Sequence, residues 1–109
     1  MADQVSPVEI GTLYDWGADV VAIPAGVQTL LAPADARRVW ISMGVQGAFA
    51  PVIVWPGGPR SDNLGLALSG INTAEFWFAR HGPICGLPWY AFSGGGGNVY
   101  LLTLSLRAG

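Results

Sequence analysis

The chain of 109 residues contains no lysine, and it has a single histidine and a single cysteine. Charged residues make up only 11% of it, and the formal net charge is −2. Phosphate neutralisation needs clustered cations, whereas the five arginines are scattered. We therefore expect no nucleic-acid partner. Because Cys85 has no second cysteine to pair with, an intrachain disulfide is excluded.

The chain also lacks the residue sets of common catalytic and metal sites. His81 and Cys85 supply at most two metal ligands, with no second pair elsewhere. The same two residues are a conceivable base and nucleophile, but cysteine is commonly a small buried hydrophobic residue. The glycine run 94–97 leads into a predicted strand, so it is predicted to be a hairpin connection and not a phosphate loop. We expect no enzyme activity, no cofactor and no metal.

Long apolar runs are missing too. No run approaches the roughly 20 residues of a membrane helix, because glycine, proline and polar residues interrupt every stretch. The first residues, Met1 to Gln4, lack the basic and apolar segments of a secretory signal. We expect synthesis in the cytoplasm and no membrane association.

What the chain does have is apolar surface. Hydrophobic residues make up 51% of it, and five of them are tryptophans. A chain of this length buries only about two-thirds of the surface that its unfolded form exposes. Aromatic residues and arginine are enriched at protein interfaces, and lysine is depleted there. The composition therefore favours a subunit that buries surface against other subunits, including copies of itself.

From residue 18 onward, short apolar or alternating runs are separated by turn residues, at a spacing typical of a sandwich or barrel. No segment of eleven or more residues keeps a helical period. The sequence predicts one all-β domain over 18–109, an antiparallel β-sandwich or jelly-roll-like domain of about eight short strands, with an N-terminal arm over 1–17. The expected strands lie near 18–23, 27–31, 37–43, 48–55, 66–68, 74–80, 89–93 and 98–106.

Strand alternation assigns faces to several tryptophans. Val39, Ile41 and Met43 are predicted to face the core, which places Arg38, Trp40 and Ser42 on the opposite face. In the same way, Phe76 and Phe78 are predicted to lie opposite Glu75 and Trp77. Together with the apolar side chains of the arm, the outward tryptophans are the predicted partner contacts: Leu13, Tyr14, Trp16, Trp40, Trp55 and Trp77.

A second hypothesis is carbohydrate binding. Tryptophans on a β-sandwich can form platforms on which sugars stack, and Glu75 beside Trp77 is positioned to line a groove. Surface glycans are then the partner.

The strand and turn pattern over about residues 20–106 resembles small virion structural proteins of tailed bacteriophages. The residues that carry this resemblance are 38–43 (RVWISM), 51–59 (PVIVWPGGP), 75–77 (EFW), 81–82 (HG) and 89–93 (WYAFS). The resemblance implies a non-enzymatic capsid decoration or cement protein, located in the virion after synthesis in the host cytoplasm. Its partners are then the major capsid protein or other virion proteins. No functional residue is carried over from this class. The high tryptophan content departs from this class and suits instead a module of a phage fibre, spike or tail tip that contacts surface glycans.

Overall fold

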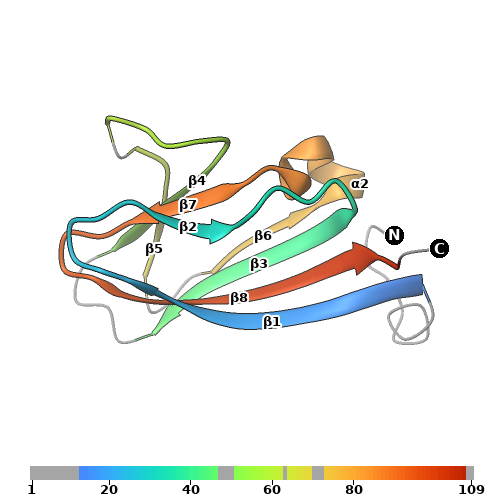
Figure 1. Cartoon of the computed structure of the whole chain (residues 1–109), viewed down its shortest axis with the longest axis horizontal. Coiled ribbons are helices and arrows are strands. Elements are labelled where there is room, and N and C mark those ends of the chain that lie inside the picture. Colours follow the sequence, from blue (N-terminus) through green and yellow to red (C-terminus); the bar gives the residue numbers. More distant parts are fainter. Residues whose placement is uncertain (1–12, 47–50, 63, 70–72, 108–109) are drawn as a thin grey trace.

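Eight strands form two four-stranded sheets in the computed structural model, which describes residues 13–46, 51–62, 64–69 and 73–107 (Figure 1). The predicted all-β sandwich is confirmed. A four-residue helix and a 3-10 turn lie between the sixth and seventh strands. The elements are β1 (Tyr14–Ile23), β2 (Thr29–Ala32), β3 (Arg38–Gln46), β4 (Val52–Pro56), β5 (Leu66–Leu68), β6 (Thr73–Trp77), α2 (Phe78–His81), η1 (Gly82–Gly86), β7 (Trp89–Phe92) and β8 (Gly97–Leu106).

The order of the strands is that of a jelly roll. One sheet, called sheet A, has the order β1-β8-β3-β6, and the other, called sheet B, has the order β2-β7-β4-β5. All pairings are antiparallel, and β1 pairs with β8, β2 with β7, β3 with β6 and β4 with β5. This nesting is what results when one long hairpin is rolled up so that its two halves form two sheets.

The core lies between the inner faces of the two sheets. Sheet A contributes Ile41, Met43, Val99 and Leu101, and sheet B contributes Val52, Val54, Leu68, Trp89 and Ala91. Trp89 is the largest fully buried side chain, and its ring centroid lies 5.0 Å from that of Phe76. The inward positions of β3, β4 and β8 follow the period of two that the sequence predicted.

Two predicted faces are wrong, for different reasons. The β3–β8 register shifts between Arg38 and Trp40, so Val39 is an extra residue and Arg38 turns to the inner side. Arg38 is only 4% exposed. Phe78 leaves the strand altogether, because β6 ends at Trp77 and residues 78–81 form a helical turn.

The boundary of the predicted arm is also corrected. Residues 14–17 belong to β1 and pair with residues 103–106 of β8. Tyr14 and Trp16 continue the apolar alternation of Ala18 and Val20, which is why the strand begins earlier than predicted. Residues 1–12 of the predicted arm lie outside the described residues.

Candidate functional site

On the outer face of sheet A, three rows of residues run across all four strands. Cross-strand partners lie on the same face of a sheet, so the register defines each row. The first, called the tryptophan row, is Trp16, Leu104, Trp40 and Trp77. The second row is Ala18, Leu102, Ser42 and Glu75. The third row is Val20, Tyr100, Gly44 and Thr73.

The tryptophan row is a continuous aromatic ridge. The ring centroids of Trp16 and Trp40 are 6.2 Å apart and stacked, and those of Trp40 and Trp77 are 5.4 Å apart. Trp40 is buried although it lies on an outer face, because its two neighbours cover it. Trp16 stands at the end of the row and remains 57% exposed.

A groove lies beside this ridge. It is open, has a volume of about 650 Å³, and is lined by Ala18, Asp19, Val20, Tyr100 and Leu102. On β1 and β8, the second row consists of Ala18 and Leu102, whose side chains are smaller than the aromatic ones in the rows on either side. The groove lies over these smaller side chains. Val20 is 54% exposed and Tyr100 is 40% exposed. The groove therefore presents apolar surface to solvent.

Glu75 is the one charged side chain in the three rows. Its Oε2 accepts a hydrogen bond of 2.9 Å from Nε1 of Trp40. The side chain is exposed, so the carboxylate fixes the Trp40 ring and still has oxygen lone pairs that face solvent.

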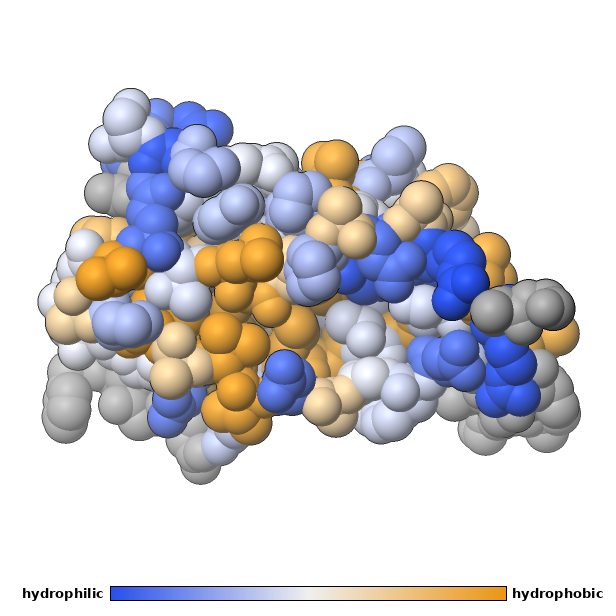
Figure 2. All heavy atoms as spheres, viewed as in Figure 1, coloured by the Kyte–Doolittle hydropathy of each residue, from blue (hydrophilic) through white to orange (hydrophobic). Residues whose placement is uncertain are grey.

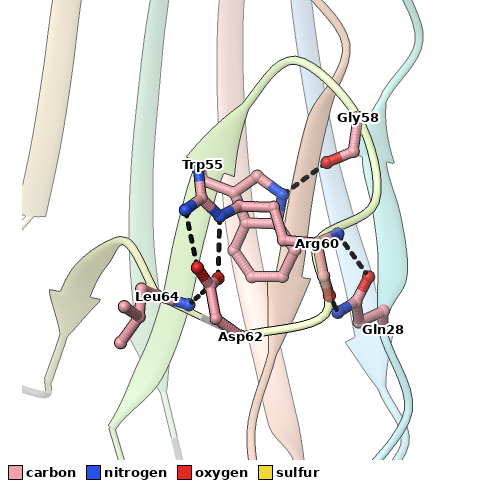
Figure 3. Close-up of polar contacts among 6 residues, drawn as sticks. All are labelled: Gln28, Trp55, Gly58, Arg60, Asp62 and Leu64. Carbon is pink, nitrogen blue, oxygen red and sulfur yellow. Dashed lines mark hydrogen bonds and ion pairs between the residues drawn. The ribbon is translucent and has the colours of Figure 1, made fainter.

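Trp55 lies on the outer face of sheet B but is not available there. Residues 57–62 fold over it, and its Nε1 donates a hydrogen bond of 2.7 Å to the carbonyl of Gly58 (Figure 3). Arg60 forms a 2.8 Å ion pair with Asp62, and its backbone N–H donates to Gln28 Oε1 at 3.1 Å. Because of this loop, Trp55 is only 3% exposed.

The loop sits tightly against the strand beneath it. A Cβ on Gly65 would meet the carbonyl of Val54 and would lie 3.1 Å from Cβ of Trp55. Trp55 also stacks on Tyr90, with the ring centroids 6.4 Å apart. Trp55 is therefore a structural residue whose indole holds the loop in place.

The structure does not join His81 and Cys85 into a reactive pair. The Cys85 side chain is fully buried, and this burial raises the pKa of its thiol, which Arg38 only partly offsets. His81 is exposed, and its Nδ1 accepts a 3.1 Å hydrogen bond from the backbone N–H of Trp77. Its ring contacts Phe76 edge-on at 5.1 Å. The thiol is buried in the protein interior, and the imidazole is held by the Trp77 backbone and the Phe76 ring.

The predicted contact residues thus fall into three groups. Trp16, Trp40 and Trp77 come together in one row, and Tyr14 lies on the same face of β1. Leu13 is exposed beside the start of β1, and Trp55 is covered. The sequence reasoning missed the groove residues Val20, Tyr100 and Leu102. The alternation of β8 was visible in the sequence, but two equally apolar faces gave no sign of which one lies outside.

On the face seen in Figure 2, with β1 and β2 in front, hydrophobic residues gather near the middle, whereas hydrophilic residues predominate among the coloured atoms at the end near the C-terminus (Figures 1 and 2). That hydrophilic end includes the 3.2 Å ion pair between Arg107 Nε and Asp15 Oδ1.

Within the described residues, no three His, Cys, Asp or Glu side chains gather as they would to hold a metal ion. The helices in the described part of the chain are too short to cross a membrane. No family model, curated protein or solved structure matches the chain.

Proposed function

We propose that this protein is a structural component of a bacteriophage virion, most simply a capsid decoration or cement protein that docks through the outer face of sheet A. The observation that carries the proposal is the apolar surface of that face, with Trp16, Val20 and Tyr100 exposed around one groove. Large exposed apolar patches on small domains mark interaction sites.

Two further observations support a docking role. Glu75 is the only charged residue in the three rows and Asp19 is the only charged residue that lines the groove, so burial of this face desolvates few charged groups. The jelly roll is also a fold of viral capsid domains, although it serves lectins as well and does not by itself define a function. In addition, the strand and turn pattern of the sequence resembles that of small virion structural proteins. The partner is then the major capsid protein or another virion protein.

A charge introduced into the groove tests this proposal. Tyr100→Arg places a cation on the proposed contact face, and we expect binding to particles that lack the protein to weaken at least tenfold, since an unpaired charge would be buried. Leu30→Arg is the matched control, because Leu30 is similarly exposed (44%) but lies on sheet B. The measurement is cosedimentation of purified protein with such particles. Equal binding of Tyr100→Arg and the wild type would contradict a contact through this face.

The exposed end of the tryptophan row favours carbohydrate binding as the second candidate. Trp16 is more than half exposed, and Ser42 and Glu75 lie in the neighbouring row, two and three strands away from Trp16, where they are placed to bond to further units of an oligosaccharide. Stacking of a sugar ring on an indole with nearby hydrogen-bonding groups is a common arrangement for sugar binding.

A glycan array on the purified protein tests this candidate. If it is correct, a defined glycan binds, and Trp16→Ala removes the signal because the exposed indole is lost. Trp55→Ala is unsuitable as a test because Trp55 is covered by its loop. Trp16→Phe, which keeps an aromatic face, should retain part of the binding. Absence of any glycan signal from the wild type would eliminate this candidate.

A further inference from the structure

Strand β1 is a long edge of sheet A whose protection is limited to two aspartates, Asp15 and Asp19. It has ten residues, contains neither lysine nor proline, and pairs with β8 without a register shift. Among the described strands, β8 is its only partner, and no other described strand pairs with its second side (Figure 1). The other edge strands, β2, β5 and β6, have four, three and five residues. Proteins usually shorten, charge or interrupt such edges, because a free edge is a template for another strand.

The hydrogen-bond pattern shows which backbone groups of β1 are free. The N–H of Arg107 donates to the carbonyl of Leu13 at 3.0 Å, and that of Leu106 donates to Arg37 at 2.7 Å. Odd residues of β8 therefore bond to β1 and even residues bond to β3. Since hydrogen-bonded and non-hydrogen-bonded pairs alternate in antiparallel sheets, the outward N–H and C=O groups of β1 belong to its even residues. These are Tyr14, Trp16, Ala18, Val20 and Ala22.

One of these outward groups is bound in a way that confirms the pattern. The N–H of Val20 donates a 2.8 Å hydrogen bond to the carboxylate of Asp19, the residue before it. An N–H that points toward β8 and bonds to it could not do so. Asp19 thus caps part of the free edge in the single chain.

We propose that two copies of this chain pair antiparallel through their β1 edges, with Ala18 on the two-fold axis. In this register, Ala18 pairs with Ala18 of the second copy, and Trp16 pairs with Val20 of the second copy. The paired segment runs from Tyr14 to Ala22, and its even residues all form hydrogen-bonded pairs. The two four-stranded sheets become one sheet of eight strands, and the two outer faces become continuous.

Charge selects this register over its neighbours. Only registers in which the outward N–H and C=O groups of one copy face those of the other copy can form hydrogen bonds, so even residues must pair with even residues. Centring the axis on residue 17 places Asp15 opposite Asp19, and centring it on residue 19 places Asp19 opposite Asp19. Like charges directly opposite each other destabilise strand pairing. With Ala18 on the axis, Asp15 faces Val21, and Asp19 faces Gly17.

The side chains fit this pairing as well. Trp16 and Val20, both more than half exposed in the single chain, would cover each other across the new strand pair. Gly17 has no side chain because a Cβ there would meet Oγ1 of Thr103, and this leaves space opposite Asp19. The N–H of Val20 would exchange its Asp19 partner for the carbonyl of Trp16 in the second copy. The proposal does not depend on attachment to a particle.

Disulfide cross-linking of single cysteine variants tests the register. Residues that form a hydrogen-bonded pair lie about 5.5 Å apart at Cα, within the range of a disulfide. We expect Ala18→Cys to give a covalent dimer on mild oxidation. Val20→Cys should not, because the two copies of residue 20 would be roughly 13 Å apart. The wild-type protein is the control for cross-linking through its native cysteine, Cys85, which is buried. A Val20→Cys dimer without an Ala18→Cys dimer would overturn the register.

A proline variant tests the pairing without cross-linking. Ala18→Pro removes an outward N–H but no hydrogen bond to β8, so the fold should persist, as proline is accepted on the free side of edge strands. Light scattering should show a dimer for the wild type and a dimer dissociation constant at least tenfold higher for Ala18→Pro, with unchanged circular dichroism. Asp19→Ala, which releases the Val20 N–H, should strengthen the dimer. A wild type that stays monomeric at millimolar concentration would overturn the proposal, even if it binds particles.

Discussion

Arg38→Met is expected to lower the free energy of unfolding by about 3–5 kcal/mol, a large share of the stability of a small domain. The guanidinium of Arg38 donates to three backbone carbonyls. Nε bonds to Cys85 at 2.7 Å, Nη2 to Leu87 at 2.7 Å and Nη1 to Pro33 at 3.1 Å. Methionine fills a similar volume but leaves these acceptors without a donor. Urea unfolding followed by tryptophan fluorescence measures the loss.

Arg38 has this effect because its guanidinium ties two separate segments, residues 85–87 and the link that contains Pro33, to β3. It holds the turn η1 and the residues after it against the link between β2 and β3. At the same joint, the N–H of Asp35 donates to the carbonyl of Gly86 at 2.9 Å, and a Cβ on Gly86 would lie 2.6 Å from the carbonyl oxygen of Asp35. Burial lowers the pKa of Arg38, while the charges of Asp35 and Cys85 oppose this shift. An arginine remains protonated at neutral pH under these conditions.

Arg60→Met is the matched control for this prediction. Arg60 carries the same side chain in an exposed ion pair with Asp62, which solvent screens, so its removal should change the unfolding midpoint little. Arg38→Lys should recover only part of the stability, because an ammonium group cannot reproduce the fork of three donors at these positions. Equal unfolding midpoints for Arg38→Met and Arg60→Met would contradict the role given to Arg38.

Trp89→Ala is expected to cost about 3–5 kcal/mol of unfolding free energy, in the range of large-to-small core substitutions. Trp89 is fully buried at the centre of the core, packs on Phe76, and donates from Nε1 to the carbonyl of Ile84 at 3.1 Å. The substitution removes the indole from the core and leaves that carbonyl without its donor. Differential scanning calorimetry would report the change as a fall in Tm.

Two further tryptophan variants are the controls for this prediction. Trp16→Ala removes an exposed indole whose main intramolecular contact is its stack on Trp40, which is expected to be worth about 1 kcal/mol. Trp89→Phe retains most of the buried ring and should fall between the two alanine variants. If Trp16→Ala were as destabilising as Trp89→Ala, the outer face of sheet A would be part of the folding core and not a contact surface.

The part of the fold that the sequence predicted depends on local pattern. Turn residues at regular spacing and apolar alternation were sufficient for an all-β sandwich with about eight strands, and Ile41, Met43 and Trp77 fell on the predicted faces. Where a local irregularity intervened, the prediction failed. The bulge at Val39 turned Arg38 inward, and the helical turn after Trp77 moved Phe78 out of the sheet.

The candidate site was predictable only in part. The sequence singled out Trp16, Trp40 and Trp77. They lie in one row only because β1 pairs with β8, β8 with β3 and β3 with β6, and these strands are distant from one another in the sequence. The burial of Trp55 depends on residues 57–62, which fold back over it. Neither contact has a signature in a single sequence.

The sequence by itself determined the composition of the surface. A chain with 51% hydrophobic residues, few charges and no lysine has to leave apolar side chains outside, because a domain of this size lacks the interior volume for them. Only the tertiary structure decided where they lie. The jelly-roll pairing places β1 at an edge and the alternate residues of β8 on an outer face, since strand order and sheet stacking are set by long-range contacts that local periodicity does not encode.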